Sequence, residues 1–97
     1  MTKELVFSDP AIGDIDEIYD YTEDNWGAAK AEDYVVELRA CCVALADQTR
    51  HGRPLRSKKQ GYLALTFRSH FIIYTESRDE LVIARILHRR MNIDGHL

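Results

Sequence analysis

The sequence lacks any segment apolar enough to cross a membrane, because no hydrophobic run approaches the roughly 18 residues that a transmembrane helix needs. Its first ten residues, MTKELVFSDP, also lack the apolar core of a secretory signal peptide. We therefore expect a chain that works in the cytoplasm and makes no contact with a membrane.

Cysteine is also scarce, since Cys41 and Cys42 are the only two in the chain. Adjacent cysteines cannot close an unstrained disulfide inside a helix, and no second pair is present to complete a zinc site. The four histidines are scattered without the spacing of metal ligands: His51, His70, His88 and His96. We expect small core cysteines in a reducing compartment, no metal site and no cofactor.

The 97 residues, 45% hydrophobic and 30% charged, predict one ordered domain over residues 1–97. A domain this small leaves about a third of its extended-chain surface uncovered, so a partner is expected to help stabilise it. Residues 1–48 hold twelve acidic and three basic residues, net −9, whereas residues 49–97 hold four acidic and ten basic ones, net +6. This split indicates either two binding faces of opposite sign or charge that serves solubility alone.

Two amphipathic helices are predicted in the first half of the chain. Ser8 or Asp9 can cap the first helix, and Pro10 is tolerated in its first turn. The inward side chains of this helix, which ends near residues 25–27, follow helical spacing: Ala11, Ile15, Ile18, Tyr19 and Thr22. After Gly27, a second helix carries its own apolar stripe: Ala31, Tyr34, Val35, Leu38, Cys41, Cys42 and Leu45. The short connection predicts an antiparallel helical hairpin.

Two charged segments allow a functional and a plain structural interpretation. Six acidic residues of the first helix could pair for acid–base catalysis, but we interpret them as a solvated outer face: Asp14, Asp16, Glu17, Asp20, Glu23 and Asp24. The basic loop from Arg50 to Gly61 either contacts phosphate or is simply a solvated loop.

Four strands are predicted, and the last three form an antiparallel meander because their connections are short: Lys3–Phe7, Tyr62–Arg68, His70–Thr75 and Leu81–His88. Strict alternation places Leu81, Ile83, Arg85 and Leu87 on one face, and Val82, Ala84, Ile86 and His88 on the other. Two helices cover only one face of a sheet, yet the last two strands are apolar on both. We therefore expect another polypeptide on the second face, and a carboxylate from the first helix or a partner beside Arg85.

The order β-α-α-β-β-β over nearly the whole chain resembles the ParE branch of the RelE/ParE toxins of bacterial type II toxin–antitoxin modules. The matching residues keep the family's order and spacing: Asp14-Ile15-Asp16-Glu17-Ile18-Tyr19, Tyr21-Thr22, Asn25-Trp26-Gly27, Ala31, Tyr34, Gly61-Tyr62, Ser69-His70, Tyr74, Arg85-Ile86-Leu87-His88-Arg89-Arg90-Met91 and His96-Leu97. The resemblance implies an α+β fold with an N-terminal helical hairpin packed on a small antiparallel sheet. The chain departs from the family at Leu63, where arginine often follows Gly-Tyr directly.

The resemblance also implies a growth-inhibiting toxin that acts on DNA gyrase, serves plasmid maintenance and is neutralised by a ParD-like antitoxin in a hetero-oligomer. Operator DNA is then reached only through the antitoxin. The expected target-binding surface is the basic end of the chain: Arg85, His88, Arg89, Arg90, Met91, His96 and Leu97. The expected antitoxin-binding residues come from the second helix and the last two strands: Tyr34, Leu38, Ile72, Tyr74, Val82 and Ile86.

The sister RelE branch offers an enzymatic alternative, the cleavage of mRNA on the ribosome. This chemistry needs cations to stabilise the transition state and acid–base groups at the 2′-hydroxyl and the leaving oxygen, for which Lys59, Arg85 and His88 are candidates. RelE-like enzymes commonly use a tyrosine near the C-terminus, and no tyrosine follows Tyr74 here. We therefore favour a non-enzymatic inhibitor, interpret His88 as a hydrogen-bonding structural residue, and keep a non-toxic co-repressor as a third interpretation.

Overall fold

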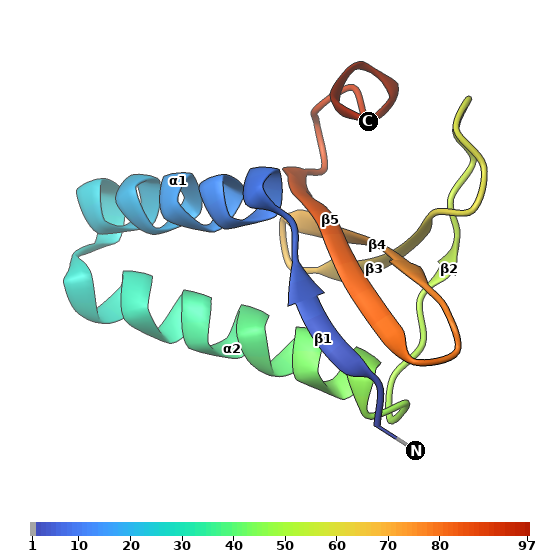
Figure 1. The fold of residues 1–97 in the computed structure, drawn as a ribbon. Helices are drawn as coiled ribbons and strands as arrows, with labels where there is room; N and C mark the ends of the chain where they lie inside the picture. Colours follow the sequence, from blue (N-terminus) through green and yellow to red (C-terminus); the bar gives the residue numbers. More distant parts are fainter. Residues whose placement is uncertain (1) are drawn as a thin grey trace.

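The computed structural model describes residues 2–97, in which a helical hairpin packs on one face of a five-stranded sheet (Figure 1). Its elements, in chain order, are β1 (Glu4–Phe7), α1 (Asp9–Trp26), α2 (Ala28–Ala46), β2 (Arg53–Pro54), β3 (Leu63–Phe67), β4 (His70–Glu76), β5 (Glu80–His88) and a 3-10 turn, η1 (Asp94–His96). This α+β arrangement confirms the predicted fold class. No helix among residues 2–97 is long and apolar enough to span a membrane.

Helix α1 begins and ends where the sequence predicts. The Ser8 hydroxyl caps it by accepting a hydrogen bond from the Ala11 N–H at 3.1 Å, and Pro10 lies in the first turn. The helix ends at Gly27, whose φ of 90° and ψ of 165° are open to glycine and strained for other residues. This residue lets the chain reverse directly into α2, which runs back beside α1 (Figure 1).

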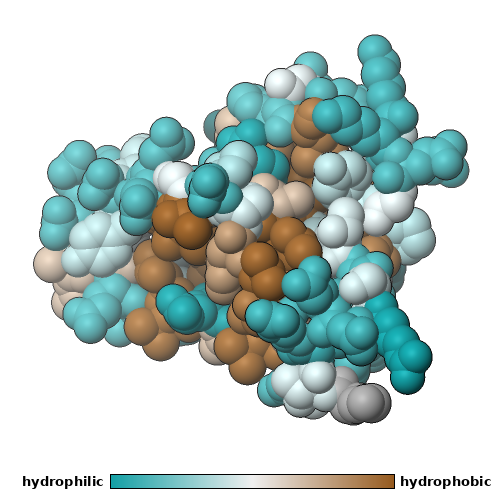
Figure 2. Space-filling view, viewed as in Figure 1, coloured by the Kyte–Doolittle hydropathy of each residue, from teal (hydrophilic) through white to brown (hydrophobic). Residues whose placement is uncertain are grey.

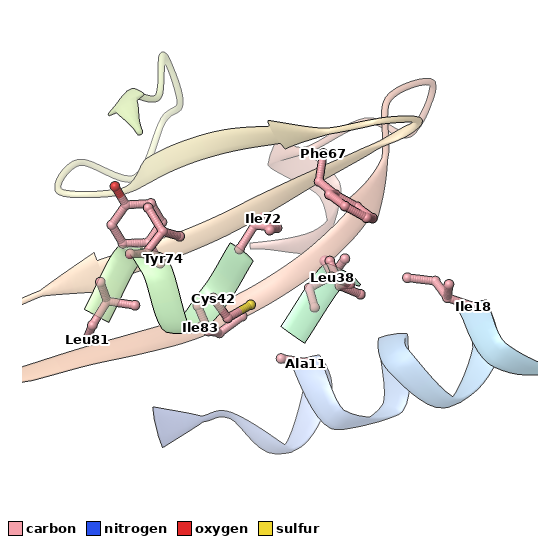
Figure 3. Close-up of a cluster of buried hydrophobic side chains, with 11 residues drawn as sticks. Ala11, Ile18, Leu38, Cys42, Phe67, Ile72, Tyr74, Leu81 and Ile83 are labelled. Atoms are coloured by element: carbon pink, nitrogen blue, oxygen red, sulfur yellow. The ribbon is translucent and has the colours of Figure 1, made fainter. Parts of the chain in front are cut away.

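The core lies between the hairpin and the facing side of the sheet (Figure 3). Within the predicted stripe of α2, Ala31, Leu38, Cys42 and Leu45 are buried, and the other members are half-buried. Burial raises the pKa of the Cys42 thiol to about 12, so this cysteine is a small core residue as expected. From β3, the side chains of Leu63, Leu65 and Phe67 complete the same core, as their alternation predicts.

Strands β3, β4 and β5 form the predicted antiparallel meander, but the sheet differs from the expectation in two details. Strand β1 pairs with β5 in parallel, from Glu4 opposite Glu80 to Phe7 opposite Ile83. The basic loop contributes β2, whose Arg53 and Pro54 pair with β3 in the antiparallel sense. The sheet is therefore mixed, with the strand order β1-β5-β4-β3-β2. Only the strands with short connections could be oriented from the sequence.

A β-bulge in β5 changes which side chains face the helices. Tyr74 pairs with Ile83 and Ile73 pairs with Arg85, so Ala84 has no partner on β4. A residue inserted in this way reverses the alternation beyond it. Ile86 consequently joins Leu81 and Ile83 in the core, and the predicted sharing of a face by Val82, Ala84, Ile86 and His88 is wrong beyond the bulge.

The second face of the sheet is less open than the sequence indicates. Ile73 and Leu87 point away from the helices, because their neighbours along each strand belong to the core, and yet both are fully buried. The loop of residues 55–61 and the C-terminal tail, defined here as residues 89–97, lie on the side away from the helices (Figure 1). They are joined where Asp94 accepts hydrogen bonds from the Ser57 hydroxyl at 2.6 Å and the Lys58 N–H at 3.1 Å. Ile73 and Leu87 therefore have almost no exposed surface, although they lie on the face that was expected to await a partner.

Candidate functional site

Helix α1 separates two hollows on the molecular surface. The larger, called the cleft, has a volume of about 940 Å³ and lies between the hairpin, the β3–β4 turn, the end of β5 and the tail. Its charged and aromatic lining includes Asp14, Glu17, Tyr21, Trp26, Lys30, Asp33, Tyr34, Glu37, Arg68, His70, Arg85, His88 and His96, and Met91 also borders it. The smaller, called the groove, has a volume of about 310 Å³ and is lined by Phe7, Ile12, Ile15, Asp16, Val35, Leu38, Arg39 and Cys42.

Asp14 and Arg85 form the central ion pair of the cleft. The guanidinium donates from Nε and Nη2 to the two carboxylate oxygens, each at 2.8 Å, and only 8% of Asp14 is exposed. The hydrogen bonds with Asp14 raise the pKa of Arg85 above its ordinary value, so the guanidinium stays charged. The predicted pairing of Arg85 with a carboxylate of the first helix is confirmed, whereas the assignment of Asp14 to a solvated face is wrong.

The position of this pair follows from the early end of β1. Because β1 stops at Phe7, the second half of β5 has a free edge whose backbone groups need other partners. The Ser8 hydroxyl donates to the Ala84 carbonyl at 2.7 Å, and Asp14 Oδ2 accepts the Ile86 N–H at 2.9 Å. Asp14 therefore binds both the backbone and a side chain of β5. Its spacing of three after Ala11 and four before Ile18 is a signal that could have placed it inward.

Arg85 also reaches the C-terminal tail. Its Nη1 donates to the His96 carbonyl at 2.9 Å, so a single guanidinium joins α1, β5 and the tail. The tail is tied separately to the preceding loop, because Lys59 Nζ donates to the Leu97 carbonyl. Hydrogen bonds from Ser57 and Lys58 lower the pKa of Asp94, which keeps that carboxylate ionised.

A hydrogen-bonded aromatic cluster lines the other wall of the cleft. The Tyr34 hydroxyl lies 2.8 Å from His70 Nδ1, and the rings of His70 and His88 meet edge to face with centroids 5.4 Å apart. Burial and the neighbouring His88 lower the pKa of His70, and burial raises the pKa of Tyr34. A neutral imidazole and a protonated phenol therefore share this hydrogen bond at neutral pH. His88 Nδ1 accepts the Arg90 N–H at 3.2 Å, which fits its predicted structural role.

The structure gathers some of the expected target-binding residues but not all of them. Arg85, His88, Met91 and His96 line the cleft, whereas Arg89 and Arg90 are exposed and do not line it. Leu97 is half-buried, and its carbonyl is bound by Lys59. Of the three nuclease candidates, Lys59 lies outside the cleft that holds Arg85 and His88.

Most of the expected antitoxin-binding residues lie in the core. Four of them are each at most 2% exposed: Leu38, Ile72, Tyr74 and Ile86. Leu38 lies on the inner side of α2, which packs against the core residues of the sheet, and the bulge turns Ile86 inward. These side chains offer a partner little surface in this conformation, although Leu38 lies at the floor of the groove and Ile86 at the floor of the cleft. Tyr34 and Val82 are half-buried and keep some exposed surface. Leu63, at the departure from the family pattern, packs against the core.

Two exposed aromatic residues of the cleft were not singled out as site residues from the sequence. Tyr21 is 68% exposed and Trp26 is 70% exposed, both near the end of the hairpin. A large aromatic ring left in solvent is unusual and often marks an interface, which is the signal that could have found them. Arg68 of the β3–β4 turn also lines the cleft, where it forms an ion pair with Glu37 of α2.

The charges of the cleft are nearly balanced. Asp14, Glu17, Asp33 and Glu37 give four carboxylates, against three Lys or Arg side chains, and two of these cations are already paired. Such a lining does not attract a phosphate backbone in the way that an excess of basic residues does. Within residues 2–97, no three His, Cys, Asp or Glu side chains are grouped as metal ligands would be.

The fold is shared with a toxin–antitoxin structure already solved, the chromosomal ParDE system from P. aeruginosa. The match has a TM-score of 0.78 at 24% identity and covers 90% of this chain and 96% of that chain. The α+β fold of that structure is therefore the class that the architecture defines.

The sequence comparisons identify the family. The model of the ParE toxin of the type II toxin–antitoxin system, parDE, matches residues 5–93. Toxin ParE1 of Mycobacterium tuberculosis is 33% identical over 98 residues and is covered completely, as is this chain; Toxin ParE1 of Caulobacter vibrioides is 35% identical over 88 residues, with 90% of each chain covered. The chain belongs to the ParE toxin family of type II toxin–antitoxin systems, which confirms the resemblance found in its residues.

Proposed function

We propose that this ParE-family toxin inhibits DNA gyrase through its C-terminal tail and is neutralised by a ParD-like antitoxin that binds the groove. The observation that supports binding of gyrase by the tail is the different surroundings of its arginines and of Arg85. Arg85 is fully engaged within the fold by Asp14 and the His96 carbonyl, whereas Arg89 and Arg90 project from the tail without an ion pair among the described residues. Exposed cations of this kind steer and orient a protein partner.

A supercoiling assay with purified toxin and gyrase tests this target. The wild-type toxin should inhibit supercoiling, and the double variant Arg89→Glu/Arg90→Glu should need at least about tenfold more protein, because charge reversal replaces attraction by repulsion. The matched control is Arg78→Glu, which reverses an exposed charge in the β4–β5 loop and should inhibit like the wild type. Normal supercoiling at high wild-type excess would refute the gyrase assignment. Continued growth of cells that express the toxin without antitoxin would instead favour the non-toxic co-repressor.

The groove supports the second half of the proposal. Its lining is mainly apolar, and Ile12, one of the lining residues, is 48% exposed. Apolar side chains gather on this face between α1 and α2 beside β1 (Figure 2). An amphipathic helix that lays its apolar face into such a groove is a common mode of peptide recognition, and Asp16 and Arg39 can meet its polar edge.

Antitoxin binding measured by calorimetry distinguishes the groove from the outer face of the sheet. Ile12→Asp should weaken the complex by about a hundredfold, because it places a charge in the apolar contact. The control Thr66→Asp, on the exposed outer face of β3, should bind normally. If Thr66→Asp weakens binding and Ile12→Asp does not, the antitoxin covers the second sheet face, as the sequence alone indicated.

The His70–Tyr34–His88 cluster supports a second candidate, a ribosome-dependent endoribonuclease. Two imidazoles in edge-to-face contact beside a hydroxyl could act as general acid and general base on an RNA 2′-hydroxyl. His88→Gln should then abolish mRNA cleavage on programmed ribosomes while antitoxin binding persists. The gyrase proposal expects no cleavage from the wild type and gyrase inhibition by His88→Gln, so one pair of assays separates the two functions.

A further inference from the structure

The far end of the tail, residues 92–97, is joined to the rest of the fold by two sets of hydrogen bonds. Among the described residues, the side-chain hydrogen bonds to residues 92–97 come from the 57–59 loop and from Arg85. The 57–59 loop lies outside the strands, whereas Arg85 belongs to β5 itself. The bond from Arg85 to the His96 carbonyl therefore links residues 92–97 directly to β5, and through Asp14 to α1, whereas Arg89, at the start of the tail, donates its N–H to the Ser69 carbonyl at 2.9 Å.

The direction of this link is set by Asp14. Its two oxygens hold Nε and Nη2 of Arg85, which leaves Nη1 of the planar guanidinium pointing at the His96 carbonyl. Asp14 is held in turn by the Ile86 N–H, so the carboxylate cannot rotate without breaking a sheet-edge bond. Lysine cannot reproduce this arrangement, because a single ammonium lacks the fork that binds two groups in fixed directions.

We propose that Asp14 and Arg85 are positioning residues that hold the far end of the C-terminal tail, residues 92–97, in the orientation in which the tail meets its target. The tail's role in target binding rests on the proposed function, whereas the seating of the tail rests on the hydrogen bonds alone. This assignment gives Arg85 an indirect role in place of the target contact expected from the sequence. It also predicts that the antitoxin groove, on the opposite side of α1, is unaffected when the link is lost.

Hydrogen exchange in the full-length toxin, followed by mass spectrometry, tests the seating. In Arg85→Lys and Asp14→Asn, the C-terminal peptide that contains η1 should lose about tenfold or more of its protection, because its amides exchange whenever the tail detaches. A peptide from the buried stripe of α2 should keep wild-type protection, which shows that the variants fold. The matched control is Glu76→Gln, which removes the Lys3–Glu76 ion pair at the opposite end of the sheet and should leave the tail protected.

Growth arrest in cells that lack the antitoxin tests the consequence for the target. The two variants should lose arrest by about tenfold in the expression level required, while purified variants bind the antitoxin with wild-type affinity. Wild-type tail protection in Arg85→Lys would overturn the proposal, and so would undiminished growth arrest by a variant whose tail is released. If the wild type itself fails to arrest growth, the proposed function falls, and the exchange measurement still decides whether Asp14 and Arg85 seat the tail.

Discussion

The groove and the cleft share α1 as a wall, yet the groove is lined mainly by apolar side chains and the cleft mainly by charged and aromatic ones. Because each residue turns the helix by about 100°, Ile12 and Ile15 face one hollow while Asp14 and Tyr21 face the other. One short helix can therefore serve an apolar partner on one side and hold a polar network on the other. Under the proposed function, the antitoxin binds on the groove side of α1, and Asp14 on its cleft side helps to hold the tail that meets the target.

The largest expected effect on stability comes from removing the Asp14–Arg85 ion pair on the cleft side of α1. Asp14→Ala leaves the Arg85 charge and the Ile86 N–H without their partner, so the free energy of unfolding should fall by about 3–5 kcal/mol in urea denaturation. The double variant Asp14→Ala/Arg85→Met should recover part of this loss, because it removes the orphaned charge. A loss below about 1 kcal/mol for Asp14→Ala would mean that the pair is dispensable for the fold.

Substitutions on the groove side of α1 should lower the free energy of unfolding by less. Ile15 is half-buried and packs against the core, so Ile15→Ala should lower the free energy of unfolding by about 1–2 kcal/mol, less than a fully buried isoleucine would. Ile12, which is 48% exposed in the same groove, is the matched control, and Ile12→Ala should cost less than about 1 kcal/mol. Equal losses of unfolding free energy in the two variants would show that Ile12 is as buried as Ile15 in solution, which means that the groove is closed.

Another wall of the cleft, which holds His70, should make the stability of the fold depend on pH. Burial and His88 lower the pKa of His70 below its ordinary 6.5 in the folded chain, although Asp14 acts in the opposite sense. Between the lowered pKa and 6.5 the unfolded chain binds more protons, so the free energy of unfolding should fall as the pH falls through this window. His70→Gln should flatten the curve measured by thermal denaturation, while His51→Gln, in an exposed loop, should leave it unchanged.

The smallest effect on stability is expected at the exposed end of the cleft. Trp26 is 70% exposed, so Trp26→Ala should change the free energy of unfolding by at most about 0.5 kcal/mol. If the cleft takes part in target binding, the same variant should weaken growth arrest without weakening antitoxin binding. Unchanged growth arrest would restrict the target surface to the tail, and a weakened antitoxin complex would extend the antitoxin surface across α1.

The sequence predicted the helices and the meander because their signals are local. The Ser8 cap, the Gly27 break and the alternation of β3 depend on residues close in the chain, and each was found in place. The sheet's parallel edge, formed by β1, and its two-residue β2 depend on distant pairings that periodicity does not report. The bulge at Ala84 was missed for the same reason, and it carried Ile86 from the expected partner surface into the core.

The candidate site was predicted only in part. The basic end of the chain and the need of Arg85 for a carboxylate followed from elementary charge arguments, and Asp14 supplies that carboxylate. The choice of Asp14 among six acids of one helix depends on the free edge of β5, which exists only once β1 has paired. The two hollows likewise arise from how the hairpin rests on the sheet, so their linings could not be separated from sequence spacing alone.

The pairing of β1 with β5 has a consequence for how the protein is made. Glu4 lies opposite Glu80, a separation of 80 − 4 = 76 residues, so the first strand has no partner until the last one has been synthesised. At about 5–20 residues per second, a ribosome needs on the order of 4–15 s to add that stretch. The helical hairpin, whose contacts are local, can form during this interval, but Phe7, Ser8 and Asp14 cannot take their places against β5. We therefore expect the groove and the cleft of this chain to be completed at the same time, when β5 leaves the ribosome and pairs with β1.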